Sequence, residues 1–148
     1  MMKRWMLFLA VASLSLTPAV SHAGKDSDEL KQFGLVGSWS FDCSKTPNPA
    51  NPFISFVPST AGQPSRQVIT GKPQYDSLVP MTDVKMLDAT HLRLTYPQGG
   101  VTVTVTLLKE QRRIRPYEAV ASDGTVSVSR GVVKASGLPT GWLLKCAD

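Results

Sequence analysis

Histidine and cysteine are scarce in this sequence, whose 148 residues hold two of each. It also lacks the G-x-S-x-G nucleophile motif, the H-E-x-x-H zinc motif, the phosphate-binding P-loop and the C-x-x-C pair. Too few histidines and thiols remain for a metal site built from those side chains. We therefore expect no metal, no cofactor and no enzymatic activity.

Little else in the chain offers catalytic chemistry. His91 is the one histidine after residue 23, so a Ser-His-Asp hydrolase site would have to use it. Its position beside a turn, on the expected outer face of a strand, favours a surface histidine instead. Asp83 and Asp88 are single acids beside turns, where such residues usually serve the turn or solubility. A hydrolase is the least favoured function class.

The first 23 residues have the features of an export signal. Lys3 and Arg4 precede an uncharged, mostly apolar run over Trp5–Leu16, and small residues, Ser21 and Ala23, stand where a signal peptidase reads. The run is short of the about 20 residues that span a bilayer, and it has no polar stripe of the kind that an amphipathic anchor carries. We expect cleavage after Ala23 and a periplasmic protein with no transmembrane segment in the mature chain.

The remaining residues, 24–148, suit one globular domain. They carry 14 Lys and Arg against 11 Asp and Glu, a net charge of +3. This small excess does not indicate a nucleic-acid partner, and export argues against one as well. Cys43 and Cys146 both lie in this part. Because exported chains meet an oxidising compartment, we expect a disulfide that closes the domain, with two buried free thiols as the alternative.

The residue pattern predicts an all-β fold with one short N-terminal helix. Asp26 and Glu29 form a possible capping box and Gly34 a stop signal for a helix over residues 26–33. Turn residues then separate ten candidate strands: Val36–Phe41, Phe53–Val57, Gln67–Thr70, Gln74–Val79, Thr82–Leu87, His91–Tyr96, Val101–Leu108, Arg112–Val120, Thr125–Arg130 and Trp142–Cys146. Eight to ten short strands of this kind predict a small antiparallel β-barrel.

Three turns set the expected registers of the central strands. The expected pairs are Leu107 with Ile114 across a turn at Glu110-Gln111, Leu94 with Val103 across residues 97–100, and Val120 with Val126 and Glu118 with Val128 across residues 122–124. These registers keep aliphatic side chains on one buried face. They also place Glu118 and Arg130 on that face. Both side chains must then pair or meet other polar groups, unless frayed strand ends leave them in solvent.

The densest charge on the expected outer face surrounds one hairpin. It comprises Lys109, Arg112, Arg113 and Arg115, with Arg93 across the sheet and Tyr117 next to the cluster. Arg93, Arg113 and Arg115 share the expected outer face and form a basic stripe. Such a basic stripe could hold an anionic envelope component or an acidic protein surface. A solvated hairpin face is the alternative.

Gly37-Ser38-Trp39 follows the short helix and opens the first strand. This order resembles the G-x-W start of the lipocalin and avidin-like (calycin) barrels. The resemblance implies that the helix and Trp39 close one end of a barrel. It also implies that an arginine from a late strand, Arg130 or Arg115, packs on the indole ring.

A longer set of residues is similar to a group of uncharacterised exported proteins of proteobacteria. The matching segments are Gly37–Cys43, Asn51-Pro52, Lys109-Glu110, Arg113–Arg115, Asp123-Gly124 and Trp142–Cys146. This resemblance implies export and the disulfide, and it implies no activity.

Each cysteine is preceded by a tryptophan four positions earlier in the sequence, Cys43 by Trp39 and Cys146 by Trp142. Residues at even offsets in a strand share a face, so Trp39 and Phe41 should point with Cys43, and Trp142 with Cys146. The aromatic side chains beside the bond are then either packed core or the wall of a ligand pocket. The candidate ligand-binding residues are Trp39, Phe41, Trp142, Glu118 and Arg130.

These patterns predict a non-enzymatic periplasmic binding protein for a small apolar or amphipathic ligand. The alternative is a module that binds a protein or the cell envelope through the basic outer face. A barrel of about eight strands can have a packed or a hollow interior. A fully packed interior would contradict the first hypothesis.

Overall fold

The computed structural model describes residues 22–148 of the chain. Residues 1–21, which carry most of the predicted export signal, lie outside the described residues. The described part begins with helix α1 (His22–Phe33), and a single turn of 3-10 helix, η1 (Pro73–Tyr75), occurs later. Everything else is strand, turn or loop, so the predicted all-β class with one short helix is confirmed.

All strands belong to one antiparallel sheet of 11 strands. Their bounds are β1 Gly37–Ser40, β2 Phe53–Val57, β3 Ser65–Ile69, β4 Ser77–Pro80, β5 Asp83–Met86, β6 His91–Gln98, β7 Val101–Glu110, β8 Arg113–Ala121, β9 Val126–Ser129, β10 Val132–Val133 and β11 Leu143–Ala147. Each of the ten predicted strands is present; β2 has the predicted bounds, and the others are shifted at one or both ends. The strand count exceeds the expected eight to ten because β10 was not expected.

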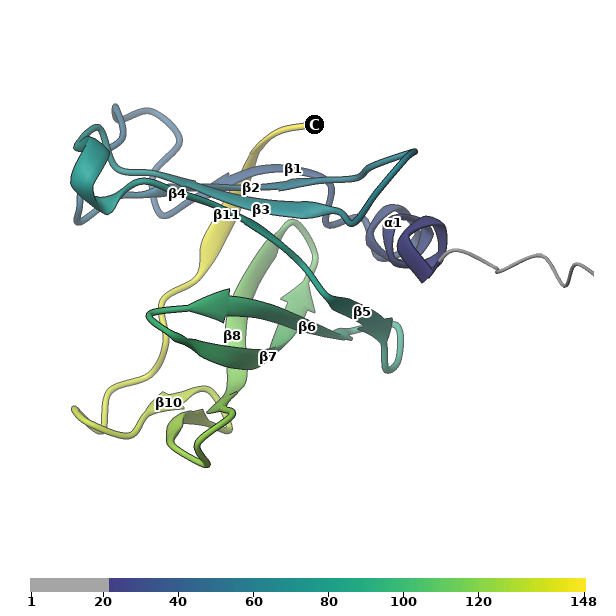
Figure 1. Ribbon diagram of the computed structural model, residues 1–148. Helices are drawn as coiled ribbons and strands as arrows, with labels where there is room; N and C mark the ends of the chain where they lie inside the picture. Colours follow the sequence, from purple (N-terminus) through teal and green to yellow (C-terminus); the bar gives the residue numbers. More distant parts are fainter. Residues whose placement is uncertain (1–21) are drawn as a thin grey trace, which may run out of the picture.

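The sheet folds over itself without closing. Its order is β4-β3-β2-β1-β11-β8-β7-β6-β5, and β9 pairs with β8 and β10. In Figure 1, β1–β4 form an upper layer and β5–β8 a lower layer, and β11 connects the two. The chain passes directly from β4 to β5 at Met81, which is fully buried, but these two strands do not pair. The fold is therefore an open barrel, and the predicted barrel is correct only as an approximation.

Helix α1 covers one end of the two layers (Figure 1). The helix ends as predicted at Gly34, whose N–H donates to Lys31, while the N–H of Leu35 donates to Leu30. Its start was predicted wrongly: the helix already includes His22, so Asp26 lies inside it and is buried. Glu29 makes no capping box, because its carboxylate accepts a hydrogen bond from the Met86 N–H of β5 at 2.8 Å.

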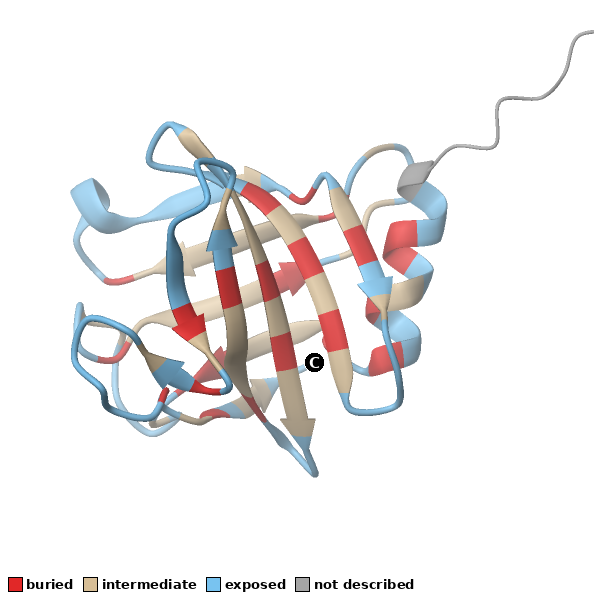
Figure 2. Ribbon diagram, turned by 90° about the horizontal axis from the view of Figure 1, so that it is seen from below, coloured by how far each residue is buried: buried red, intermediate tan, exposed pale blue. Residues whose placement is uncertain are grey.

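Buried residues alternate with more exposed ones along the lower layer (Figure 2). Two hairpin registers differ from the prediction by two residues: Leu94 pairs with Val105, and Lys109 pairs with Ile114. The first turn, at Gly99-Gly100, is shorter than the expected four residues, and the second is a two-residue turn as expected but lies one residue later, at residues 111–112. Because an even shift preserves the side-chain faces, Leu94 and Ile114 still point inward.

An irregularity in β8 reverses the faces of its second half. Pairing shifts by one residue, so that Glu118 lies opposite Thr106 and Ala119 opposite Val105. Val105 and Ala119 are buried, which puts Glu118 on the outer side and leaves Val120 38% exposed. The inward positions predicted for Glu118 and Val120 are therefore wrong, and the β-bulge is the reason.

Arg130 is also misplaced by the prediction. It does not belong to β9, because Arg130 and Gly131 form a tight turn with φ of 50° and 74° between paired Ser129 and Val132. Arg130 is exposed, and its N–H donates to the Glu118 carboxylate at 3.0 Å.

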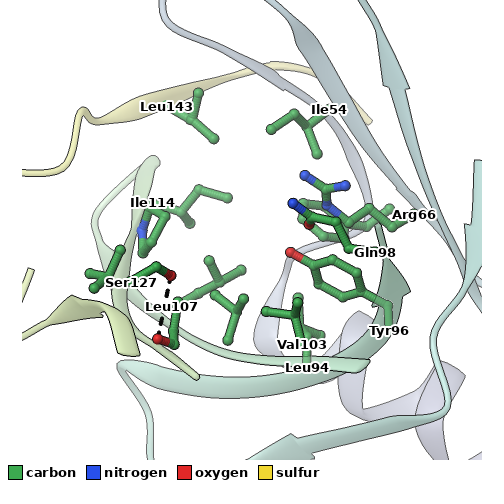
Figure 3. A pocket seen from close by; sticks show the side chains of 15 residues that line it. Ile54, Arg66, Leu94, Tyr96, Gln98, Val103, Leu107, Ile114, Ser127 and Leu143 are labelled. Atoms are coloured by element: carbon green, nitrogen blue, oxygen red, sulfur yellow. Dashed lines mark hydrogen bonds between the residues drawn. The ribbon is translucent and has the colours of Figure 1, made fainter. Parts of the chain in front are cut away.

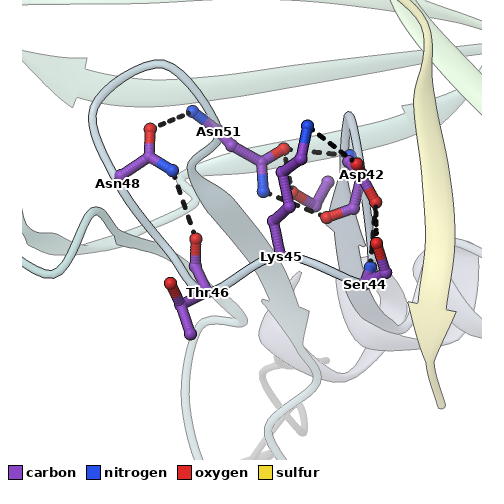
Figure 4. Close-up of polar contacts among 7 residues, drawn as sticks. Asp42, Ser44, Lys45, Thr46, Asn48 and Asn51 are labelled. Carbon is purple, nitrogen blue, oxygen red and sulfur yellow. Dashed lines mark hydrogen bonds and ion pairs between the residues drawn. The ribbon is translucent and has the colours of Figure 1, made fainter.

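Cys43 and Cys146 form the predicted disulfide, with 5.3 Å between their Cα atoms. The proline-rich loop after Cys43 is ordered by the buried side chain of Asn51 (Figure 4). The Asn51 Oδ1 accepts hydrogen bonds from the Ser40 hydroxyl and the Asp42 N–H, and its Nδ2 donates to the Asp42 carbonyl. Hydrogen bonds from the Ser44 hydroxyl and N–H lower the pKa of Asp42. The polar groups of this loop satisfy one another, which is typical of a structural role.

Candidate functional site

A cavity of about 210 Å³ lies between the two layers of the sheet (Figure 3). Side chains from β2, β3, β6, β7, β8, β9 and β11 line it. Its walls are mostly aliphatic and include Ile54, Leu94, Val103, Leu107, Ile114 and Leu143. The interior of this barrel is therefore packed at the α1 end and hollow further along.

Small side chains on β8 and β9 leave room for this cavity. Ala119 and Ser127 both line it, while the larger Val120 points outward. The bulge in β8 produces this arrangement, because a regular strand would have turned Val120 inward in place of Ala119. Interiors are normally close-packed, so a hollow of this size needs such a local cause.

Three of the four polar side chains that line the cavity, Arg66, Tyr96 and Gln98, lie together on one side of it (Figure 3). The fourth, Ser127, lies on the other side, where its hydroxyl donates a hydrogen bond to the Ala119 carbonyl at 3.5 Å. Arg66 stands on β3 between Phe56 of β2 and Val79 of β4, so it belongs to the inner face. Its Cζ atom lies 4.8 Å from the centroid of the Tyr96 ring. Among the described residues, Arg66 has no ion pair and its guanidinium makes no hydrogen bond. A cation without a counter-ion thus borders an apolar cavity.

Arg66 and Gln98 also line a second hollow, of about 520 Å³. We call it the side opening; its other lining residues are Val68, Ser77, Val79, Pro97, Gly99 and Gly100. It lies where the sheet fails to close, because β5 pairs with β6 only as far as Thr95. The two hollows therefore share their polar residues.

The structure places Trp39 away from this cavity. Its indole is 1% exposed near α1, and its Nε1 donates a hydrogen bond to the Leu35 carbonyl at 2.8 Å. A basic side chain does face the ring, but it is Lys145, with its Nζ 5.8 Å from the ring centroid. Arg130 and Arg115, the predicted partners, lie elsewhere: one is in the β9–β10 turn, and the other packs on Trp142.

The predicted aromatic cluster beside the disulfide does not form. Strand β1 ends at Ser40, so the alternation that would join Trp39, Phe41 and Cys43 breaks, and Phe41 is 45% exposed. Trp142 lies outside as well, next to Leu143, which faces the cavity. The cations of Arg113 and Arg115 lie 4.2 Å and 4.6 Å from its ring centroid. None of the five predicted ligand-binding residues lines the cavity.

Arg93 and Arg113 of the basic stripe are partly exposed and both form ion pairs, whereas the Nε of Arg115 is buried and has no hydrogen-bond partner among the described residues. Arg93 pairs with Asp83 at 3.4 Å, and Arg113 with Glu110 at 2.8 Å. Arg115 stacks on Trp142. Tyr117 meets the edge of the His91 ring at a centroid distance of 5.3 Å. The stripe therefore presents less free positive charge than the sequence suggests.

His91 is the first residue of β6 and contacts the preceding β5–β6 turn. Its Nδ1 lies 3.0 Å from an Asp88 carboxylate oxygen and 3.1 Å from the Thr90 hydroxyl. In a hydrolase triad the acid and the nucleophile contact opposite ring nitrogens, whereas here both groups meet the same one. Hydrogen bonds from Thr90 and His91 lower the pKa of Asp88 to about 2. These contacts stabilise a turn.

Sequence reasoning did not identify Arg66, Tyr96 or Gln98 as site residues. The predicted third strand began at Gln67, which left out Arg66, yet Arg66 is in phase with Val68. Tyr96 and Gln98 continue the alternation of the inward-facing leucines of β6. Tyr96 already lay inside the predicted strand His91–Tyr96. Extending that strand by two residues and starting the third strand one residue earlier would have placed Gln98 and Arg66 on the inner face as well.

No family model, curated protein or solved structure matches this chain. Within residues 22–148, no helix is long and apolar enough to cross a membrane. The same described residues contain no group of three or more His, Cys, Asp or Glu side chains placed to hold a metal ion.

Proposed function

We propose that this protein is a non-enzymatic binding protein that holds a small apolar or amphipathic ligand between its two layers. The observation that carries the proposal is the mostly aliphatic cavity, with Arg66, Tyr96 and Gln98 grouped at one edge. Concave, mostly apolar sites with a few convergent polar groups are the usual form of small-molecule sites.

The size of the cavity limits the ligand. An engineered apolar cavity of about 150 Å³ takes a benzene molecule, so this one suits about eight carbon atoms. Larger molecules would have to extend into the side opening, which shares Arg66 and Gln98 with the cavity.

The alternative function, a module that binds proteins or the envelope through the basic stripe, has less support. Arg93 and Arg113 already pair with acidic side chains, and Arg115 packs on Trp142. We also propose that the protein acts in the periplasm. The signal-like residues 1–23 and the Cys43–Cys146 bond support that location.

A cavity-filling variant tests the proposed function. Ala119→Leu adds three carbon atoms inside the cavity, and Val120→Leu adds one on the outer side of the same strand. Calorimetric titration with 1-octanol should give saturable binding to the wild type and to Val120→Leu, and at least tenfold weaker binding to Ala119→Leu. Equal binding to all three proteins would contradict the proposal.

A further inference from the structure

We propose that the ligand is a single-chain amphiphile with an anionic head, held with its tail in the cavity and its head on Arg66. This inference rests on the proposed function and adds the charge, the orientation and the length of the ligand.

The sign of the charge follows from the lining residues. Arg66 is the one charged residue among those that line the cavity, and it is also the one charged residue of the side opening. A carboxylate in either place would neutralise it, and neither lining set contains Asp or Glu. A guanidinium beside apolar walls attracts an anion more strongly than it would in water, because the local dielectric constant is lower.

The neighbouring polar groups suit a carboxylate. The planar guanidinium of Arg66 can donate two parallel hydrogen bonds to one carboxylate. The Tyr96 hydroxyl and the Gln98 amide make no hydrogen bond among the described residues, and both lie beside Arg66 in Figure 3. Two further donors are thus free for the same head group.

The tail must lie on the opposite side of Arg66 from the side opening. Leu107, Ile114 and Leu143 face the polar group across the cavity (Figure 3) and offer it no hydrogen-bonding side chain. Each buried methylene is worth about 0.8 kcal/mol, or about fourfold in affinity. Affinity should rise with chain length to about eight carbons, the capacity inferred from cavity volume, and then level off.

The test uses three molecules with the same tail: octanoate, 1-octanol and octylammonium. The protein is expressed from the full-length sequence and titrated in a calorimeter at pH 7. Wild type should bind octanoate at least tenfold more tightly than 1-octanol, as expected for a hydrogen bond to a charged group, and octylammonium most weakly. Arg66→Gln should abolish the preference for octanoate without weakening 1-octanol binding. Arg66→Lys should keep part of it.

Arg93→Gln is the matched control, because it removes one arginine from the outer face and leaves the cavity unchanged. It should preserve the octanoate preference. The pH dependence gives a second measurement that needs no variant. Below about pH 4 a carboxyl group is protonated, so octanoic acid should bind wild type no better than 1-octanol.

The two proposals fail in different ways. If 1-octanol binds but octanoate is not preferred, or if the preference survives in Arg66→Gln, the anionic head is wrong and the binding function remains. If none of the three molecules binds to wild type, both proposals are overturned.

Discussion

The close approach of β1 and β11 determines which residue can occupy position 37. Gly37 has a φ of +111°, and a Cβ atom there would lie 2.1 Å from the carbonyl oxygen of Ala147. Neither the backbone conformation nor the space admits a side chain. The β1–β11 register is irregular at the next step, between Ser38 and Trp39. Gly37 therefore lets the last strand approach while Trp39 turns toward the core.

Trp39 and Trp142 should respond differently to removal. Trp39→Ala deletes a fully buried indole and its hydrogen bond to Leu35, so the free energy of unfolding should fall by about 3–5 kcal/mol. Trp142→Ala removes a partly exposed ring that packs on two arginines, and should cost much less. Urea denaturation measures both changes. Equal losses would contradict the assignment of Trp39 to the core and Trp142 to the outer face.

At the scale of elements, the sequence predicted strands and faces where alternation is regular. The alternating residues of β6 and β7 gave the correct buried face although two turns were misplaced. Both predicted registers were wrong by two residues, and an even shift does not change the face to which a side chain points. The bulge in β8 was missed, yet it had a signal in Pro116, which lacks an N–H and is poorly suited to a central strand. One extra residue there reversed the faces of the sheet to which Glu118, Ala119 and Val120 point. The cavity lies where this local irregularity changes the pattern, so periodicity alone could not reveal it.

The β5–β6 turn should contribute to stability in a pH-dependent way. Hydrogen bonds from Thr90 and His91 lower the pKa of Asp88 from 3.8 to about 2 in the folded protein. The stabilisation is therefore complete above about pH 4 and is lost as the pH falls through 2. Asp88→Asn keeps an acceptor oxygen but removes the charge.

The melting temperatures of wild type and Asp88→Asn should differ most above pH 4 and converge toward pH 2. Asp28→Asn, which removes an exposed carboxylate from α1, controls for net charge. A difference between wild type and Asp88→Asn that stays constant from pH 6 to pH 2 would contradict the role of the Asp88 charge.

At the scale of the whole molecule, one covalent bond joins the two ends of the sheet-forming chain. Cys43 and Cys146 are 103 residues apart in sequence. Cys43 follows β1 and Cys146 belongs to β11, and these two strands are neighbours in the sheet. Such a cross-link restricts the unfolded chain over nearly the full length of the domain. The disulfide lies beside β11, whose strand pairing with β8 involves only Leu143 and Leu144.

Cys43→Ser combined with Cys146→Ser should lower the free energy of unfolding by about 2–4 kcal/mol. Thermal melts with and without a reductant give the measurement. Reductant should destabilise the wild type and leave the double variant unchanged. A wild-type melting temperature that is insensitive to full reduction would show that the bond adds no stability.

The pairing of the first strand with the last also imposes an order on assembly. β1 occupies residues 37–40 and is made early in synthesis, but its partner β11 occupies residues 143–147 and is made much later. Until those residues are available, β1 and β8 both keep an open edge, and Leu143 is missing from the cavity wall. Contacts this distant in sequence slow folding, and open edges promote association between incomplete chains. Loss of residues 143–147 would therefore leave the cavity wall incomplete and the edges of β1 and β8 unprotected.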